Sequence, residues 1–368
     1  MLAGEEGPGA AMAMRVVVAV AAVRGATSLV EVTGAHVDSC LYHGRAGLDF
    51  AQRLVELGAR VRVPTTLNVG SLDLLHPATV LRRTAHEQEV AAGGRALMDA
   101  YVALGARPTW TCAPYQLDAR PSPGEHVAWA ESNAIAFANS VLGARTDRYG
   151  DFLDVCAAVT GRAPLAGLHL TSNRRGGLVL DCRGLGPRTL DGDLAYPLLG
   201  YLAGLRCGTG LNPVLLGLPE DTDEDRLKAL GAAAASSGGV ALFHVVGVTP
   251  EAPTLEAALQ GGPATTVTVT GAELRAAREE LSTARGTALD AVSLGTPHAS
   301  PAEVAALAQG LLDGPPLHPQ VTLWLSTSRS VLEQARAAGH LEVLERAGVR
   351  VVVDTCTYVT SILDPSTR

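Results

Sequence analysis

The segment from Thr111 to Asp154 reads TCAPYQLDARPSPGEHVAWAESNAIAFANSVLGARTDRYGDFLD. It places Cys112 in a turn-like Cys-Ala-Pro-Tyr, continues through a loop rich in proline and glycine, and then enters a helical pattern. The apolar residues of that pattern recur at helical spacing: Ala134, Ile135, Ala138, Val141 and Leu142. This spacing predicts a helix with one face in the core.

The second face of this helix carries small or polar residues where a surface helix would carry Lys, Arg and Glu. They are Ser132, Ala136, Asn139 and Gly143, with Glu131 and Asn133 beside them. Such a face is covered, either by other parts of the protein through hydrogen bonds or by a site that holds a polar ligand, and residue types favour neither. Arg145 and Arg148 follow Gly143, and paired guanidiniums commonly bind a carboxylate or phosphate.

Composition limits the class of protein. The chain has 368 residues, of which 47% are hydrophobic and 18% charged, which predicts one large or two intimate α/β domains. A formal charge of −8 argues against a nucleic-acid-binding surface and favours small molecules or another subunit as partners. We expect residues 1–13 to form a loose leader. Six scattered cysteines, no secretory pattern and no bilayer-length apolar run predict a cytoplasmic, non-membrane protein with reduced thiols.

Residues 29–64 show the order strand (29–32), polar loop, helix (46–57) and strand (60–64), which predicts a βαβ unit. Ligands of open α/β sheets bind at the carboxyl ends of strands. The candidate site residues there are His36, Asp38, Cys40, Thr66 and Asn68. Taken alone, a histidine of this kind is more often structural than catalytic, and a cysteine such as Cys40 is more often a small buried hydrophobe.

Three later strands, expected at 291–294, 321–325 and 349–353, also end in polar clusters. The clusters are Gly-Thr-Pro-His-Ala-Ser with His298, Ser-Thr-Ser-Arg with Thr327 and Arg329, and Asp-Thr-Cys-Thr with Cys356. Because purely structural connections are shorter and less polar, this arrangement indicates a site.

Several strings occur in the order and approximate spacing of one known family: CAPY, EHVAWAESNAIAFANSVLGARTDRYGDFLD, GAHVDSCLYHGRAGLDFAQRLVELGARVRVPTTLN, HLTSNRRG, LGTPHAS, LWLSTSR and VVVDTCTY. From residue 14 to the end the chain resembles the large, catalytic part of aconitase X, a hydrolyase branch of the aconitase superfamily. The resemblance implies an α/β fold with a multi-layer α/β/α aconitase-like architecture and mostly parallel sheets. His43-Gly44-Arg45 departs from the acidic loop expected there.

The resemblance also implies a cofactor and a partner. Cys112 and Cys356 stand in strings where the superfamily holds an iron-sulfur cluster, whereas Thr296 occupies the place of a third cysteine in some branches. Cys40 or a non-thiolate group would then complete a smaller iron site, or the cluster differs in type, so the expected cofactor is an iron-sulfur cluster or mononuclear iron. Relatives use a mobile swivel domain with a catalytic serine. We find no such domain here, which implies a separate small swivel-domain subunit.

Removing water from a β-hydroxy acid has two difficult parts, because hydroxide is a poor leaving group and the α-proton is weakly acidic. The expected general acids or bases are His36, Asp38, Glu131 and His298. The expected carboxylate-binding arginines are Arg145, Arg148, Arg174 and Arg329. The expected orienting groups are Thr66, Asn68, Ser132, Asn133, Asn173 and Thr327.

The LGTPHAS string resembles the branch that dehydrates cis-3-hydroxy-L-proline to 1-pyrroline-2-carboxylate, and this is the leading hypothesis. A phosphomevalonate dehydratase large subunit, which resembles the three-cysteine form, is the alternative enzyme. A degenerate, non-catalytic subunit or small-ligand binder is the third reading. The hydrolyase interpretation depends on one expectation, that Cys112 and Cys356 meet at a shared pocket beside Ser132 and Asn133.

Overall fold

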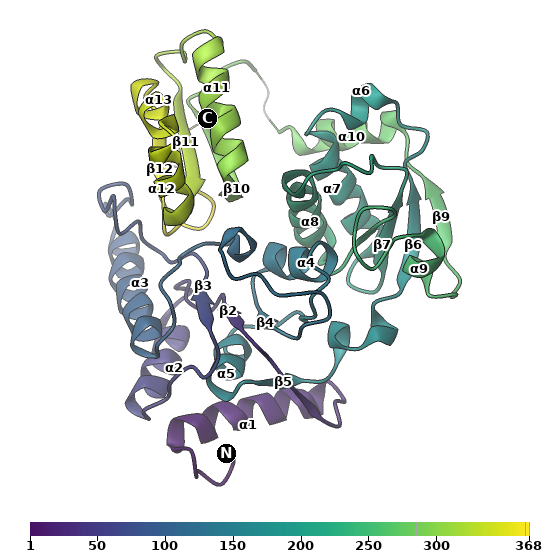
Figure 1. The fold of residues 1–368 in the computed structure, drawn as a ribbon. Helices are drawn as coiled ribbons and strands as arrows, with labels where there is room; N and C mark the ends of the chain where they lie inside the picture. The colour runs from purple at the N-terminus through teal and green to yellow at the C-terminus, as the bar shows by residue number, and fades with distance from the viewer. Residues whose placement is uncertain (284–285, 365, 368) are drawn as a thin grey trace.

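The computed structural model describes every residue except 284–285, 365 and 368. The elements gather in three regions that follow one another along the chain (Figure 1). The first region lies around the N-terminus, the second contains the helices at 195–207 and 224–238, and the third ends at the C-terminus.

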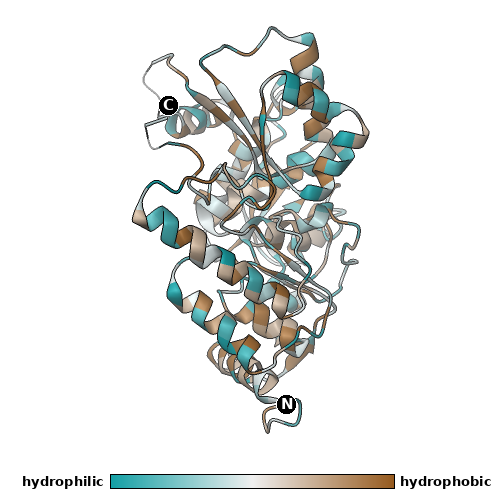
Figure 2. Cartoon of the chain, turned by 90° about the vertical axis from the view of Figure 1, so that its left-hand side faces the viewer, coloured by the Kyte–Doolittle hydropathy of each residue, from teal (hydrophilic) through white to brown (hydrophobic). Residues whose placement is uncertain are grey.

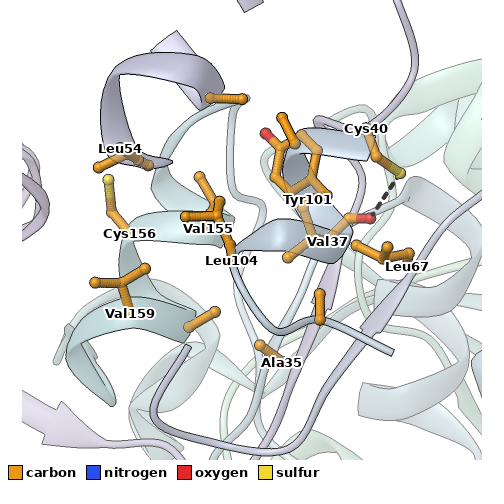
Figure 3. Close-up of a cluster of buried hydrophobic side chains, with 14 of the residues drawn as sticks. Ala35, Val37, Cys40, Leu54, Leu67, Tyr101, Leu104, Val155, Cys156 and Val159 are labelled. Atoms are coloured by element: carbon orange, nitrogen blue, oxygen red, sulfur yellow. Dashed lines mark hydrogen bonds between the residues drawn. The ribbon is translucent and has the colours of Figure 1, made fainter. Parts of the chain in front are cut away.

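The first region contains α1 (Pro8–Val23), β1 (Leu29–Glu31), β2 (Ala35–Val37), α2 (Arg45–Glu56), β3 (Thr65–Leu67), α3 (Ala85–Ala103), β4 (Ala128–Trp129), α4 (Ser132–Ser140), α5 (Leu153–Thr160) and β5 (Arg162–Pro164). Its main sheet has the order β3-β2-β4, and both pairings are parallel. The core beneath it joins side chains from several elements, among them Leu54, Leu67, Tyr101 and Val155 (Figure 3).

The predicted leader at residues 1–13 is wrong from Pro8 onward, because α1 begins there. Proline at the first helical position is preorganised for a helix, and the alanines that follow are the strongest helix formers. Ala13 and Val17 are fully buried in the first core. A Cβ added at Gly9 would lie 2.7 Å from the backbone nitrogen of Ala59, so this small residue permits the close approach.

The predicted βαβ unit is also corrected. The strand at 29–31 pairs antiparallel with β5, and residues 60–64 lie outside any strand. The parallel neighbour of β2 is β3, which begins just after Pro64, a residue that has no N–H to donate to a ladder. His36 therefore lies within β2 rather than in the loop after it, and pairs in register with Thr66.

The second region contains β6 (Gly176–Asp181), α6 (Pro187–Leu190), α7 (Ala195–Cys207), β7 (Asn212–Leu216), α8 (Glu224–Gly238), β8 (His244–Val245), α9 (Leu255–Leu259), β9 (Thr265–Thr268) and α10 (Gly271–Leu281). Its sheet has the order β8-β7-β6-β9, with every pairing parallel. Helices α7 and α8 approach closely, because a Cβ added at Gly200 would lie 2.1 Å from the carbonyl oxygen of Leu230. The glycine and alanine content of this segment thus serves helix packing.

The third region contains β10 (Ala291–Ala299), α11 (Pro301–Asp313), β11 (Thr322–Thr327), α12 (Arg329–Ala337), α13 (His340–Arg346) and β12 (Arg350–Val352). The three strands expected here are confirmed, and they form a parallel sheet of order β10-β11-β12. Helix α11 starts with a capping box between Ser300 and Glu303.

The α/β class with mostly parallel sheets is confirmed by these three sheets. Hydrophilic and hydrophobic residues alternate along the outer helices (Figure 2), as expected of helices with one face on a core. Among the described residues, none of the helices is both long enough and apolar enough to cross a bilayer.

Candidate active site

A cavity of about 720 Å³ is lined by residues from all three regions, and we call it the site cavity. Seven residues predicted from the sequence line it: Asp38, Asn68, Cys112, Glu131, Ser132, Asn133 and Cys356. The expectation that Cys112 and Cys356 meet at one pocket, with Ser132 and Asn133 in its wall, is therefore confirmed.

Parallel strands deliver three of these seven residues. Asp38 directly follows β2, Asn68 directly follows β3, and Cys356 follows β12. Carboxyl ends of parallel strands lie at one edge of their sheet, which brings residues distant in sequence together. Helix α4 lies centrally between the three regions (Figure 1), so that its first residues reach the same cavity.

The N-terminal end of α4 is fastened to the Cys112 loop. The Glu131 carboxylate caps the helix by accepting from the backbone N–H groups of Asn133 (3.1 Å) and Ala134 (2.8 Å). The Asn133 amide donates to the carbonyl oxygen of Cys112 at 3.0 Å and accepts from the Tyr115 hydroxyl at 2.7 Å. Capping and side-chain bonds thus fix one cysteine relative to the Glu131 carboxylate.

His298 connects the two cysteine loops. Its backbone N–H donates to the sulfur of Cys112 at 3.2 Å, and its imidazole bonds with the Thr111 hydroxyl at 3.1 Å and the Thr355 carbonyl oxygen at 3.0 Å. The side chain is fully buried, and burial lowers its pKa to about 4, so it is neutral near pH 7. It does not line the site cavity, and its contacts are those of a positioning residue rather than the acid or base expected.

The segment before Cys356 is anchored to the first region. Arg329 donates twice to the carboxylate of Asp354, at 2.7 and 2.6 Å, and that carboxylate also accepts from the backbone N–H of Leu74 at 3.1 Å. Asp73 in turn accepts from the backbone N–H of Val353 at 3.1 Å. Arg329 was expected to bind substrate, but it lies outside the lining of the site cavity and holds this segment instead.

Two of the carboxyl groups in the cavity lining, those of Asp38 and Glu131, have different pKa values. Burial raises the pKa of Asp38 to about 6, while the hydrogen bond from Asn68 lowers it and the charge of Asp151 raises it. Burial and the nearby charge of Asp38 raise the pKa of Glu131 to about 8, against the lowering effect of its bonds to Ala134. Near pH 7, Asp38 is therefore mainly ionised and Glu131 mainly protonated.

Asn68 offers a further polar atom. Its amide nitrogen donates to Asp38, whereas its Oδ1 is buried and has no hydrogen-bond partner among the described residues. Asn68 lines the site cavity and is 2% exposed. A buried carbonyl without a partner is costly unless a ligand or water bonds to it, so this atom fits a ligand's donor.

Two thiols lie where iron could bind. Cys112 and Cys356 line one cavity, burial raises both of their pKa values, and the Thr296 hydroxyl hydrogen-bonds to Cys356. Thiolates are soft ligands that suit iron, so the pair fits an iron centre. Among the described residues, no group of three or more His, Cys, Asp and Glu side chains is arranged to hold a metal. Thr296, in the place of a third cysteine, faces this same cavity.

Cys40 is not positioned as the third ligand. Its sulfur is fully buried against the carbonyl oxygens of Val37 (3.4 Å) and Asn68 (3.3 Å), and Figure 3 shows it directed at Val37. Burial raises its pKa far above the ordinary value, and it does not line the site cavity. Cys40 therefore packs as a small buried residue, apart from the cavity that Cys112 and Cys356 line.

The remaining candidates lie elsewhere or bond within the protein. Arg174 is fully buried, pairs with Glu251 at 2.8 Å, and donates to Asn139 Oδ1 at 2.9 Å. The imidazole of His36 bonds with the Thr66 hydroxyl at 2.8 Å, beside the cavity rather than in its lining. The other contacts are Arg145 with the His169 carbonyl, Arg148 with the Gly239 carbonyl, Asn173 with the Gly167 carbonyl and Thr327 with the Ala299 carbonyl.

The polar face of α4 was expected either to wall a ligand site or to be covered by the protein itself. Each expectation holds at one end of the helix. Its start walls the site cavity, while Asn139, further along, bonds to the carbonyl oxygens of Thr146 (3.0 Å) and Ala241 (2.9 Å). Ala136 is packed in the core of the second region. Polar residues at the far end are thus covered by the protein itself.

Lys228 is a cavity residue that the sequence analysis missed. In the segment EDRLKALGAAAASSG it resembles an ordinary solvated helix charge. The available signal was spacing, since Lys228, Ala232 and Ser236 lie four residues apart and all line the cavity. After Lys228 this face of the helix carries only small residues, which is unusual for a solvated surface.

The chain matches three family models in order. They are the aconitase X first domain at residues 1–172, the second domain at 179–279 and the third domain at 289–368. A crystal structure of aconitase X from Thermococcus kodakaraensis in its holo form superposes with a TM-score of 0.87 at 34% identity, covering 98% of this chain and 88% of that one. The fold is therefore that of an aconitase X protein.

Sequence relatives agree with the fold. A cis-3-hydroxy-L-proline dehydratase of Pseudomonas aeruginosa is 49% identical over 362 residues, covering 97% of this chain and 60% of that protein. One of Hypocrea jecorina is 43% identical, covering 96% of this chain and 59% of that protein. The phosphomevalonate dehydratase large subunit of Methanothermobacter thermautotrophicus is 38% identical, covering 99% of this chain and 87% of that protein. The chain belongs to the aconitase X family, and it spans 60% and 59% of the two hydroxyproline relatives.

Proposed function

We propose that this chain is the large catalytic part of a hydro-lyase that removes water from cis-3-hydroxy-L-proline. The reaction breaks the Cα–H and C3–O bonds and forms a carbon-carbon double bond. The resulting enamine tautomerises to 1-pyrroline-2-carboxylate. The identities of 49% and 43% to dehydratases of this name support the proposal.

The charge balance of the site cavity is the observation that carries the choice of substrate. Its lining contains the carboxyl groups of Asp38, Glu131 and Glu303 and the single ammonium of Lys228. Hydroxyproline is a zwitterion, so its ring ammonium suits the ionised Asp38 and its carboxylate suits the lysine. Phosphomevalonate carries a phosphate and a carboxylate and no cation, so it would bring two anionic groups to one ammonium beside the ionised Asp38.

The pKa values assign complementary roles to two residues. Asp38, with its pKa near 6, is ionised near pH 7 and accepts the substrate proton as general base. Glu131, with its pKa near 8, is protonated near pH 7 and gives a proton to the departing hydroxyl, which leaves as water. Asn68 Oδ1, which has no partner among the described residues, accepts a hydrogen bond from the substrate.

Cys112 and Cys356 hold the cofactor in this proposal, either an iron-sulfur cluster or mononuclear iron. Bound iron would supply Lewis acidity at the oxygen of the leaving hydroxyl. His298 and Asn133 serve it by holding the two cysteine loops in place. All six cysteines are free and buried, in keeping with a reducing cytoplasm as the compartment.

A small swivel-domain subunit is the proposed partner. The archaeal relatives named as large subunits share up to 38% identity with this chain, which covers 87% of that relative's length. A large subunit is named as one part of a heteromer, and this supports a separate small chain here.

The test is substrate turnover by the chain and its partner, co-expressed and purified anaerobically with iron. We expect loss of cis-3-hydroxy-L-proline and appearance of 1-pyrroline-2-carboxylate, detected with o-aminobenzaldehyde. Turnover of phosphomevalonate but not of cis-3-hydroxy-L-proline would instead support a phosphomevalonate dehydratase. Turnover of neither substrate by an iron-loaded complex would support a non-catalytic subunit.

A further inference from the structure

We propose that Lys228 binds the carboxylate of the substrate, and that Asp225 and Glu303 hold its ammonium group at the cavity wall. The inference rests on the proposed function and deepens it, since it names the residue that recognises an α-carboxylate. None of the arginines expected to do so lines the site cavity.

The environment of Lys228 is that of a built site. Its side chain is only 3% exposed, and lysine is rarely buried to this extent without a partner. Its Nζ donates to Asp225 at 2.9 Å and also to Glu303. An ammonium group has three N–H donors. These two bonds leave one donor for a ligand in the cavity that Lys228 lines.

The two acids that hold Lys228 are themselves occupied by fixed donors. Ser300 donates through its hydroxyl to Asp225 at 2.6 Å and through its backbone N–H to Glu303 at 2.8 Å. Asp225 lies in the first turn of α8 and Glu303 in the first turn of α11, where the helix macrodipole favours negative charge. These contacts partly offset the two carboxylates, and the third N–H of the Lys228 ammonium remains for an anion.

No other cation competes for the role. Among the described residues that line the site cavity, Lys228 is the one lysine, arginine or histidine. It also bridges α8 of the second region and α11 of the third, whereas Asp38 and Glu131 line the same cavity from the first region. A substrate held by Lys228 would therefore share this cavity with the proposed base and acid.

A purely structural ion pair is the competing explanation, and it predicts different measurements. A structural lysine affects stability, whereas a carboxylate-binding lysine affects recognition of the carboxylate. L-Proline and pyrrolidine separate the two, because as competitive inhibitors they differ only in that group.

The experiment compares wild type, Lys228→Met and Arg206→Met in the iron-loaded complex. Arg206, on α7, pairs with Glu273 outside the site cavity and is the matched control. For Lys228→Met we expect KM for cis-3-hydroxy-L-proline and Ki for L-proline to rise roughly 10- to 100-fold, as for a lost bond to a charged group. Ki for pyrrolidine should stay within twofold, and Arg206→Met should leave all three constants unchanged.

An unchanged Ki for L-proline in Lys228→Met would overturn the inference. Should that variant fail to fold, Lys228→Met/Asp225→Asn removes the charge together with one of its partners and must show the same loss. Failure of the proposed function can be told apart from failure of the Lys228 inference. In the first case wild type itself would neither turn over hydroxyproline nor be inhibited by L-proline.

Discussion

The two ends of α4 carry similar polar residues but serve different purposes. At its start, Glu131 and Asn133 lie in the wall of the site cavity. At its far end, Asn139 and Arg174 bond to each other and to backbone carbonyls. The two ends differ in where their polar side chains find hydrogen-bond partners: the start faces a cavity, whereas the far end bonds within the protein. A polar helix face therefore indicates a ligand site only where its polar atoms are left without partners inside the protein.

Replacing either cavity thiol should give the largest effect. For Cys112→Ser and Cys356→Ser we expect loss of bound iron and a fall in turnover of more than roughly a hundredfold, since changes that only support a metal ligand already reach that size. Cys40→Ala is the control, because Cys40 lies outside the cavity lining and should keep iron. Elemental analysis of each purified complex measures the difference, and iron retained in both serine variants would refute the assignment.

Glu131→Gln should lower kcat by roughly 10²- to 10⁴-fold, the range for loss of a general acid. The pH profile checks the role. In wild type, kcat/KM should fall below pH about 6 as Asp38 becomes protonated and loses its function as a base. It should also fall above pH about 8 as Glu131 loses its proton and can no longer act as an acid. The alkaline fall should disappear in Glu131→Gln, and its persistence would assign the acid elsewhere.

Arg174→Met tests the far end of α4, where we expect an effect on stability rather than on catalysis. The variant leaves Glu251 and several buried acceptors without their donor, which should cost roughly 3–5 kcal/mol in the free energy of unfolding. Denaturant unfolding measures this loss. The KM of the folded fraction should match wild type, and a selective rise in KM would instead place Arg174 in substrate binding.

Arg148→Ala should give the smallest effect. Its exposed side chain bonds to the Gly239 carbonyl, so turnover should change less than twofold and unfolding free energy by about 0.5–1 kcal/mol. A tenfold loss of turnover would show that the arginine-containing loop after α4 contributes to the reaction. The contrast between the two ends of α4 would then no longer hold.

Much of the fold could be predicted from sequence because strand and helix periods are local. The third-region strands and the helix at 45–56 follow directly from such patterns. The antiparallel pairing of 29–31 with β5 could not be predicted, because a strand of three residues has no register information of its own.

The site was predictable in part. The cysteines and the start of α4 stand in distinctive strings, and the cavity unites them. The bridging role of His298 could not be read from the sequence, because it depends on partners far away in the chain, such as Thr111. Helical spacing offered a signal for Lys228, but its pairing with the distant Glu303 could not be predicted. Arginines in a loop look alike in sequence whether they bind a ligand or a backbone carbonyl.

Anomalous diffraction at the iron edge, from crystals of the iron-loaded complex with L-proline bound, tests the central claim most directly. We predict an iron peak beside the sulfurs of Cys112 and Cys356, with the L-proline carboxylate at Lys228. Iron located away from both sulfurs, or L-proline seated among Arg145, Arg148 and Arg174, would contradict it.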